Sequence, residues 1–412
     1  MKAFFTFLMG LVLSSIGLRA AEPFYRGADI SWYTEMEAAG KKFYSTQGTP
    51  TECNELMAQC GMNAIRLRVW VEPTLGGWCG TEDVVRKAVA AQAAGHEVLI
   101  DFHFSDFFAD PGRQAIPAAW QGLSLEEMCQ KVTDHTRSVL QALKEAGVTP
   151  RWVQLGNESR NGMLYSAFDT GSKTWKDAGG VTGSTSAAKG GGWANYVALS
   201  NAGYDAAKGV FPDVVCMVHL DTRGSDTDLS WWFTPFLKAG GKLDMVGLSH
   251  YPMPWASSEA NAKATALQRN QNLLTIMEKT HATVNVPFMV VETGVYVDFV
   301  NGGKEVMADL LQKCHTKAYC QGVFYWEPEQ YNWWKPAIYG TLGWQNYNMA
   351  AFLSSGRPSA ILQAFIDDAE TTGILPIVRT TPTTTQFDLQ GRIATSATPG
   401  VRISQGKKIM CK

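Results

Sequence analysis

Two glutamates stand at the ends of short apolar segments, in positions where carboxyl groups could do acid–base chemistry. Glu158 directly follows the segment 152–157, and Glu292 closes the segment 288–292. Paired carboxyl groups suit cleavage of glycosidic bonds, because one acid protonates the leaving oxygen while the other group attacks the sugar or activates water. A retaining reaction needs the two groups about 5–5.5 Å apart, and an inverting reaction roughly 6.5–9.5 Å. A salt-bridged structural glutamate explains either residue alone better than it explains both together.

Further polar and aromatic residues lie where other apolar segments end. They are Arg66, His103, Asp106, Asn157, His219, Asp221, Tyr251 and Trp326. Imidazoles, carboxylates, an amide and an indole at the same end of successive segments indicate a binding site, because a purely structural distribution would place polar residues at both ends. Together with the two glutamates, these residues form the predicted site.

The segments that must position these residues alternate between two patterns along the chain. Short apolar runs predict strands at 24–30, 64–70, 98–103, 152–157, 214–220, 245–250, 288–292 and 322–326. Longer runs with helical spacing predict helices at 51–60, 81–94, 125–146, 196–210, 229–239, 264–280, 304–317 and 358–369. Near-continuous apolar strands separated by helices are typical of a parallel sheet that is covered by helices.

Eight such repeats favour a closed (β/α)8 barrel of the α/β class, a TIM barrel, over an open doubly wound sheet. An open sheet usually needs a glycine-rich phosphate turn after its first strand, whereas Ser31-Trp32-Tyr33 follows that strand here. In a barrel the C-terminal ends of all strands meet at one face, and active sites form there. The predicted fold therefore brings the site residues to one rim.

The N-terminus has the pattern of a signal peptide. Within residues 1–21, Lys2 precedes the apolar run 3–13, and Ala20-Ala21 provides small residues for cleavage. No other stretch is apolar enough to cross a membrane. We therefore expect the barrel, at 22–370, to be secreted, periplasmic or attached to the cell surface.

The C-terminal segment 371–412 differs in composition from the rest of the chain. Thr380-Thr381-Pro382 belongs to a stretch rich in threonine and proline, which predicts a linker. Two strand-like runs near 386–389 and 401–403 follow, with glycines between and after them. This segment predicts a small β-hairpin module that lies outside the barrel.

Composition narrows the possible partners. The net charge is −2 with no long run of one sign, so neither nucleic acid nor an anionic membrane surface is an expected partner. The chain holds 14 Trp, 13 Tyr and 19 Phe, and such rings can stack on sugars or pack beneath long loops. The G-x-S-x-G, H-E-x-x-H and phosphate-loop patterns are absent, which sets the corresponding chemistries aside. We expect a monomer that requires no cofactor.

The cysteines are too sparse for a disulfide scaffold, since there are 8 in 412 residues. Cys314 and Cys320 are close enough in sequence to pair across a helix-to-strand turn. Cys216 lies in an apolar run, and we expect it to be a buried thiol.

Several motifs between residues 24 and 367 resemble glycoside hydrolase family 53, the endo-β-1,4-galactanases of clan A. The motifs are Arg26-Gly27-Ala28-Asp29-Ile30-Ser31, Arg66-Leu67-Arg68-Val69-Trp70-Val71, His103 with Ser105-Asp106 and Ala109-Asp110-Pro111, Gly156-Asn157-Glu158 with Asn161-Gly162-Met163-Leu164, and Tyr325-Trp326-Glu327-Pro328. The Asn-Glu pair is common to the whole clan. The Ser-Asp, Ala-Asp-Pro and Asn-Gly-Met-Leu segments are much more specific to the family.

The resemblance implies retaining hydrolysis of β-1,4-galactan, the side chain of pectin, by double displacement. In that reaction Glu158 would be the general acid/base and Glu292 the nucleophile. A nearby cation such as Arg66 would keep the nucleophile ionised. The resemblance also implies that Asn157 binds the sugar next to the scissile bond and that Tyr251 orients Glu292.

The remaining predicted residues would line the cleft by the same resemblance. Trp326 would form the floor of the subsite, and the other positions are His103, Asp106, His219 and Asp221. Some family members hold a structural calcium in a late loop. Residues 331–355 lack the aspartate-rich sequence expected for that ion, so calcium remains an open alternative to our expectation of no metal.

Three departures from the family pattern leave the number of subsites and the endo or exo mode open. Thr293-Gly294-Val295-Tyr296 replaces an aromatic-proline continuation, Phe108 stands where tryptophan is usual, and 171–192 forms a Gly/Ser/Thr/Lys-rich insertion. The alternatives are another clan A β-glycanase, such as a β-mannanase or β-glucanase, and a non-catalytic glycan-binding barrel.

Overall fold

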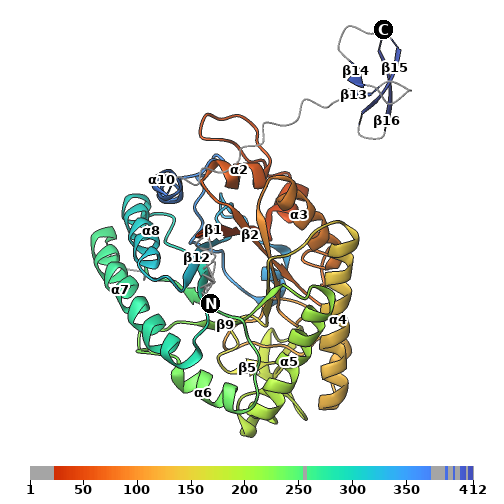
Figure 1. The fold of residues 1–412 in the computed structure, drawn as a ribbon, viewed down its shortest axis with the longest axis vertical. Coiled ribbons are helices and arrows are strands. Elements are labelled where there is room, and N and C mark those ends of the chain that lie inside the picture. The colour runs from red at the N-terminus through yellow and green to blue at the C-terminus, as the bar shows by residue number, and fades with distance from the viewer. Residues whose placement is uncertain are drawn as a thin grey trace, which may run out of the picture.

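Eight parallel strands form a closed barrel in a computed structural model, which describes residues 23–253 and 258–372 and, as backbone only, four short strands within 386–411 (Figure 1). Around the barrel the strand order is β1-β12-β11-β10-β9-β4-β3-β2. The bounds are β1 Tyr25–Asp29, β2 Ala64–Val69, β3 Glu97–Phe102, β4 Trp152–Leu155, β9 Val215–Asp221, β10 Met245–His250, β11 Phe288–Thr293 and β12 Cys320–Trp326. The predicted (β/α)8 barrel is confirmed, with strand ends within a few residues of the expected positions.

The helices lie outside the barrel and surround it (Figure 1). They are α1 Tyr33–Ala38, α2 Cys53–Gln59, α3 Thr81–Ala93, α4 Leu125–Glu145, α5 Trp193–Val210, α6 Ser230–Lys238, α7 Glu259–Val284, α8 Val300–His315, α9 Ala337–Leu342 and α10 Gln363–Thr371. Helix α7 is longer than predicted because the Ser258 side chain caps it by accepting from Asn261 N–H. It ends at Asn285, which adopts a left-handed conformation.

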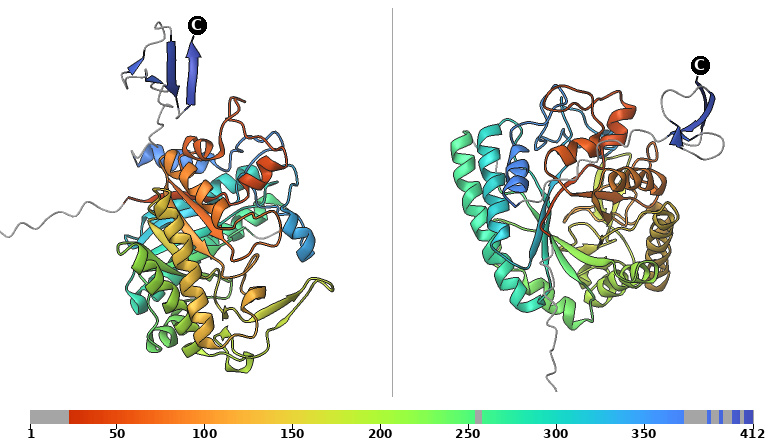
Figure 2. Two further views of the ribbon diagram at one scale, coloured as in Figure 1. Left: turned by 90° about the vertical axis from the view of Figure 1, so that its right-hand side faces the viewer. Right: turned by 45° about the horizontal axis from the view of Figure 1, so that its top comes forward.

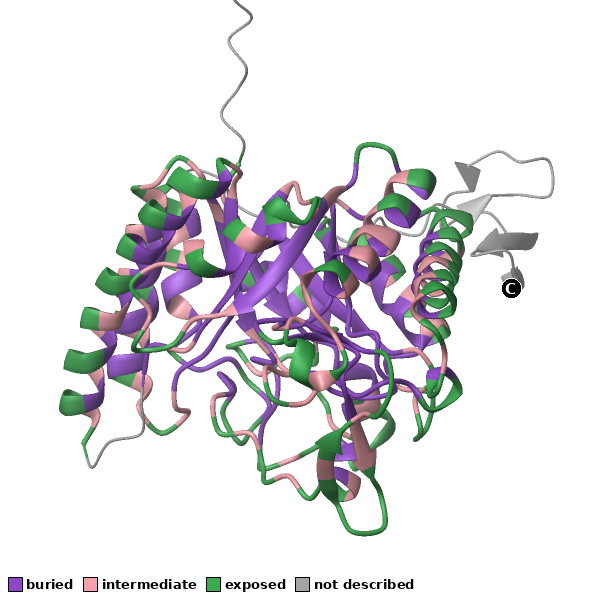
Figure 3. Cartoon of the chain, turned by 90° about the horizontal axis from the view of Figure 1, so that it is seen from below, coloured by how far each residue is buried: buried purple, intermediate pink, exposed green. Residues whose placement is uncertain are grey.

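Buried residues occupy the strands and the helix faces that are turned toward them (Figure 3), and their side chains pack in two layers. The larger layer packs between strands and helices, and a smaller apolar cluster fills the barrel interior. The interior cluster consists of Tyr25, Ala64, Leu99, Trp152, Met217, Met245, Met289, Val291 and Phe324. Because alternate residues of a strand share a face, Arg66 and Arg68 point inward like Ala64, but nearer the C-terminal end of β2. The apolar cluster therefore lies beneath a polar layer at the barrel mouth.

The loop after β4 contains short strands. Strand β5 Gly162–Met163 pairs with β8 Gly183–Ser184, and β6 Ser166–Asp169 pairs with β7 Thr174–Asp177. The β6–β7 hairpin extends away from the barrel (Figure 2). The insertion predicted at 171–192 is thus partly folded into these two small sheets.

The C-terminal module contains more strands than the predicted hairpin. β13 Gln386–Phe387, β14 Ile393–Ala394, β15 Gly400–Ser404 and β16 Lys407–Cys411 form an antiparallel sheet in the order β14-β13-β15-β16. The predicted signal peptide lies outside the described residues, and so does the predicted linker beyond residue 372. Within the described part of the chain, no helix is long and apolar enough to span a membrane.

The cysteines for which the structure describes side chains are all free thiols. Cys216 is fully buried, as predicted. Cys314 and Cys320 do not form the disulfide that their spacing allowed, although their thiols are in hydrogen-bond contact. That hydrogen bond, together with burial, raises the pKa of the Cys314 thiol well above its usual value.

We expect Gly322→Ala to destabilise the barrel by about 1–3 kcal/mol, because the added Cβ would collide with the carbonyl oxygen of Tyr25 where β12 pairs with β1. Thermal unfolding followed by circular dichroism measures the effect. Gly340→Ala is the matched control, since a Cβ at that position in α9 meets no atom within 4 Å. Equal melting temperatures for the two variants would contradict this account of the β1–β12 seam.

Candidate active site

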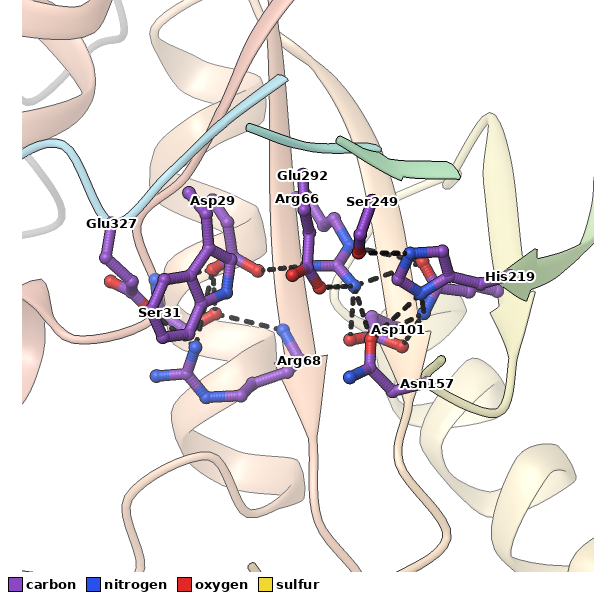
Figure 4. Close-up of polar contacts among 12 residues, drawn as sticks. Asp29, Ser31, Arg66, Arg68, Asp101, Asn157, His219, Ser249, Glu292 and Glu327 are labelled. Atoms are coloured by element: carbon purple, nitrogen blue, oxygen red, sulfur yellow. Dashed lines mark hydrogen bonds and ion pairs between the residues drawn. The ribbon is translucent and has the colours of Figure 1, made fainter. Parts of the chain in front are cut away.

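The Arg66 guanidinium lies at the centre of the polar layer (Figure 4). One terminal nitrogen donates to Asp29 Oδ2 at 2.7 Å, and the other donates to Asp101 Oδ2 at 2.8 Å and Asn157 Oδ1 at 2.9 Å. The second nitrogen also forms an ion pair with Glu292 Oε1 at 2.8 Å. A planar guanidinium with five N–H donors can hold several acceptors at once. Arg66 therefore fixes side chains from β1, β3, β11 and the end of β4 relative to one another.

The Glu292 carboxyl is held from two sides. Arg66 contacts Oε1, and the Tyr251 hydroxyl donates to Oε2 at 3.1 Å. Burial raises the pKa of Glu292, and the positive charge of Arg66 opposes this effect. Arg66 and Tyr251 thus contact both carboxyl oxygens of Glu292.

Glu158 sits in a strained turn immediately after β4. Its backbone φ is 45°, a left-handed conformation that non-glycine residues rarely adopt, and Gly156 has a φ of 87°. The Glu158 N–H donates to Nδ1 of His219 at 3.2 Å. Strain of this kind persists only where the surrounding structure enforces it, and it gathers at functional sites.

The pKa of Glu158 is raised well above its ordinary value, mainly by burial and next by the negative charge of Glu292. A raised pKa keeps a carboxylic acid protonated and able to donate. Arg66 meanwhile favours the ionised form of Glu292. Both pKa values are raised, but that of Glu158 is raised further, so the two carboxyl groups differ in proton affinity, as acid–base chemistry requires.

Both glutamates open into one cavity of about 210 Å³, which we call the central cavity. Its lining residues are His103, Phe108, Ala109, Asp110, Arg113, Asn157, Glu158, Tyr251, Glu292, Trp326 and Trp344. Aromatic rings therefore form part of the wall beside the two carboxyl groups. Trp326 packs against Tyr347 and Trp32, with ring centroids 4.8 and 5.2 Å apart, which fixes the orientation of the indole.

Of the ten predicted residues, six line the central cavity: Glu158, Glu292, Asn157, His103, Tyr251 and Trp326. The Asn157 side chain is largely committed within the protein. Its amide nitrogen donates to the Ala109 carbonyl oxygen at 2.8 Å, and its oxygen accepts from Arg66. Arg66 itself is fully buried beneath the cavity, so it acts on Glu292 and Asn157 and not on a ligand directly.

Three predicted cleft residues do not line the central cavity, which corrects the expectation from the sequence. The Asp106 carboxylate accepts from the backbone N–H groups of Glu72 and Ala118 and so fixes the loop after β3. Asp221 forms ion pairs with Arg160 at 2.7 Å and Arg223 at 3.0 Å. His219 is fully buried and contacts the turn that carries Glu158. The position of a residue at a strand end places its side chain near the barrel mouth, but it does not determine the hydrogen-bond or ion-pair partners of that side chain.

Sequence reasoning missed much of the supporting network. The missed residues with polar side chains in that network are Asp29, Asp101, Gln154, Ser249 and Glu327, which join Arg66, Arg68 or His219. Charged residues inside otherwise apolar strands were a usable signal for Asp29 and Asp101. Phe108 was noted only as a departure from the family pattern, and no signal marks Trp344; both residues reach the cavity from loops.

No group of three or more His, Cys, Asp or Glu is placed to hold a metal ion in the parts of the chain with described side chains. No step is assigned to a metal. The absence of a required cofactor remains a prediction.

We expect Glu292→Gln to lower the pKa of Glu158, because the negative charge that helps to raise it is lost. Carboxyl-carbon NMR titration of glutamate-labelled protein measures the change. Glu305→Gln provides the control, since Glu305 is exposed and pairs with Lys263 on the outer surface. An unchanged or higher Glu158 pKa in Glu292→Gln would show that the two carboxyl groups do not interact.

Comparison with known proteins places this geometry in a family. The model of "Glycosyl hydrolase family 53" matches residues 25–365. The arabinogalactan endo-β-1,4-galactanase of Thermothelomyces thermophilus is 29% identical over 323 residues, which cover 74% of this chain and 89% of that protein. The enzyme of the same name from Cellvibrio japonicus is 27% identical over 390 residues, covering 88% and 94%. An uncharacterized protein from the bgaB 5′ region of Niallia circulans is 35% identical over 231 residues, covering 56% of this chain and only 60% of that protein.

Solved structures agree with the sequence relatives. A fungal β-1,4-galactanase structure is 28% identical with a TM-score of 0.65, covering 83% of this chain and 98% of that one. The family 53 catalytic domain of Ignisphaera aggregans is 25% identical with a TM-score of 0.66, covering 83% and 95%. The fold, the paired glutamates and the family match lead to the same conclusion: the chain belongs to glycosyl hydrolase family 53.

Proposed function

We propose that this protein is a retaining endo-β-1,4-galactanase that hydrolyses the β-1,4-galactan of type I arabinogalactan. One observation carries the proposal: Glu158 and Glu292 share the central cavity, and the pKa of Glu158 is raised well above its usual value, whereas Arg66 opposes the rise in the pKa of Glu292. The named relatives supply the substrate class, since they are arabinogalactan endo-β-1,4-galactanases.

The first step of the proposed reaction forms a covalent intermediate. The Glu292 carboxylate attacks the anomeric carbon, the glycosidic C–O bond breaks, and Glu158 delivers its proton to the leaving oxygen. Arg66 and Tyr251 hold Glu292 in place for this attack. Asn157 lies beside Glu158 in the cavity wall, consistent with a role at the sugar next to the scissile bond.

The second step reverses the roles of acid and base. Glu158, now ionised, removes a proton from water, and the resulting hydroxide attacks the anomeric carbon and displaces Glu292. Two inversions restore the original anomeric configuration. This route requires the carboxyl groups to lie about 5–5.5 Å apart, which remains a prediction for this site.

Aromatic side chains in the cavity wall support a carbohydrate substrate. Trp326, Phe108 and Trp344 present apolar rings, and the C–H face of a sugar packs well on such surfaces. The Arg113 guanidinium lies 5.0 Å from the Trp344 ring and backs that side of the cavity. We assign Trp326 to the floor of the subsite at the scissile bond.

The proposal extends to the location and state of the protein. The signal-peptide pattern at 1–21 supports export, so that the enzyme meets its polysaccharide outside the cytoplasm or at the cell surface. We propose a monomer that requires no cofactor.

Initial rates on potato galactan, mannan and a soluble cellulose derivative test the substrate assignment. We expect galactan to be hydrolysed much faster than the other two, with oligosaccharides of several sizes early in the reaction because cleavage is internal. Faster hydrolysis of mannan or cellulose would favour a different clan A activity. Release of a single short product from the start would contradict the endo mode.

Glu292→Ala should lower kcat by several orders of magnitude, because the residue that forms the covalent intermediate is removed. Titration calorimetry should still detect binding of galactan oligosaccharides, since the rest of the central cavity is intact. Glu305→Ala is the control and should retain full activity, because Glu305 is exposed on the outer surface. An active Glu292→Ala variant would overturn the assigned role.

A further inference from the structure

His219 contacts the Glu158 turn through both its backbone and its ring. The Ser159 N–H donates to the His219 carbonyl oxygen at 2.9 Å, and the Glu158 N–H donates to His219 Nδ1 at 3.2 Å. The ring is fully buried and absent from the lining of the central cavity. His219 can therefore affect a reaction only through the residues it touches.

The contacts of the ring determine which nitrogen carries the hydrogen. Nδ1 lies near two donors, the Glu158 N–H and the Gln154 side-chain nitrogen at 3.0 Å. An Nδ1–H tautomer would donate to Asn157 Oδ1 at 3.0 Å, but it would leave the Glu158 N–H without an acceptor. The hydrogen is thus assigned to Nε2. Burial lowers the pKa of His219 well below its usual value, so the ring is neutral.

The Nε2–H group has one partner, the Ser249 hydroxyl at 2.8 Å (Figure 4). When Ser249 Oγ accepts this hydrogen bond, its own hydrogen is free to be donated onward. The Ser249 side chain is near enough to the Glu158 carboxyl to lower its pKa by hydrogen bonding. Hydrogen bonds join the Glu158 backbone to His219 and His219 to Ser249, and Ser249 in turn influences the Glu158 carboxyl.

We infer that His219 and Ser249 are positioning residues that hold Glu158, backbone and carboxyl together, in the geometry for proton transfer. The inference rests on the proposed function, in which Glu158 is the general acid/base. His219 accepts the N–H of the strained Glu158 turn, and Ser249 fixes the rotation of the carboxyl. Neither residue lines the central cavity, so each acts through the residues that it contacts, and Glu158 is the one that both influence.

The charges that face Glu158 come from three neighbouring elements. They are Glu292 on β11, Asp221 on β9 and Asp110 in the loop after β3, and each raises the pKa of Glu158. None of them is altered when His219 or Ser249 is replaced by a neutral residue. A change in the pH profile of such a variant therefore reports the lost hydrogen bond and not a lost charge.

Two substrates separate proton donation from other defects. A galactan oligosaccharide has a sugar leaving group that needs a proton, whereas dinitrophenyl β-galactobioside releases a phenolate that does not. For His219→Asn and Ser249→Ala we expect kcat/KM on galactotetraose to fall by about 10- to 100-fold. The same ratio on the dinitrophenyl substrate should fall far less.

The pH profile gives a second, independent readout. Ser249 lowers the pKa of Glu158, so Ser249→Ala should raise it and move the basic limb of kcat/KM for galactotetraose to higher pH. His219→Gln can still reach Ser249 with a side-chain amide in place of Nε2–H. The basic limb of His219→Gln should therefore lie closer to the wild-type position than the basic limb of His219→Asn.

His135→Asn is the control, because His135 is a half-buried histidine on α4 and lies outside the polar layer. It should leave the ratio between the two substrates and the pH profile unchanged. The inference would be overturned if Ser249→Ala lost kcat/KM equally on both substrates and kept the wild-type pH profile. Cleavage of galactan by the wild-type protein would in that case still support the proposed function. If the wild-type protein failed to cleave galactotetraose at all, the proposed function and the inference would both be wrong. Ser249→Ala keeps the test decisive if the His219 variants do not fold.

Discussion

Arg66 is a positive charge with no access to solvent, and the organisation of the barrel mouth depends on how that charge is neutralised. Removing a guanidinium from water costs several kcal/mol, which only close ion pairs and hydrogen bonds offset. Burial acts to lower the pKa of Arg66, but Asp101, Glu292 and Asp29 outweigh it and raise the pKa overall. Asp101 also pairs with His103 at 2.9 Å, and Asp29 accepts from Ser31 at 2.6 Å. Glu292 is thus the one carboxyl of the three that both neutralises Arg66 and lines the cavity.

The alternation of side chains along the strands explains why this polar layer lies where it does. On β2, β4 and β9 an apolar inward residue is followed two positions later by a polar one. The pairs are Ala64 and Arg66, Trp152 and Gln154, and Met217 and His219. The first residue of each pair belongs to the apolar interior cluster, and the second belongs to the polar network beneath the central cavity. Apolar packing below and hydrogen bonding above therefore hold the same strands in register.

The sequence was sufficient to predict the barrel and its two glutamates, because both follow from local signals. Apolar strands of regular spacing indicate a parallel barrel, and the C-terminal ends of such strands share one face. Helix α7 exceeded its prediction because its start depends on the Ser258 cap, which hydrophobic spacing does not detect. The cavity contacts of Trp344 likewise depend on the path of a long loop, for which local sequence carries no periodic signal.

The sequence predicted which residues gather at the barrel mouth better than it predicted which of their side chains face the central cavity. His219 was expected in the cleft, but the strained turn at Glu158 needs a buried acceptor for its N–H, and His219 provides it. Asp221 was also expected in the cleft, but it forms ion pairs with Arg160 and Arg223. The orientation of such a polar side chain depends on which buried hydrogen-bonding groups need a partner, and these groups come together only after folding.

The central claim is that Glu292 attacks the sugar directly instead of activating a water molecule. Proton NMR of the first products released from galactan tests it most directly, because the anomeric configuration can be observed before mutarotation. Double displacement through Glu292 predicts that the new reducing ends appear first as the β-anomer. Initial appearance of the α-anomer would contradict the account, since it would require single displacement by water.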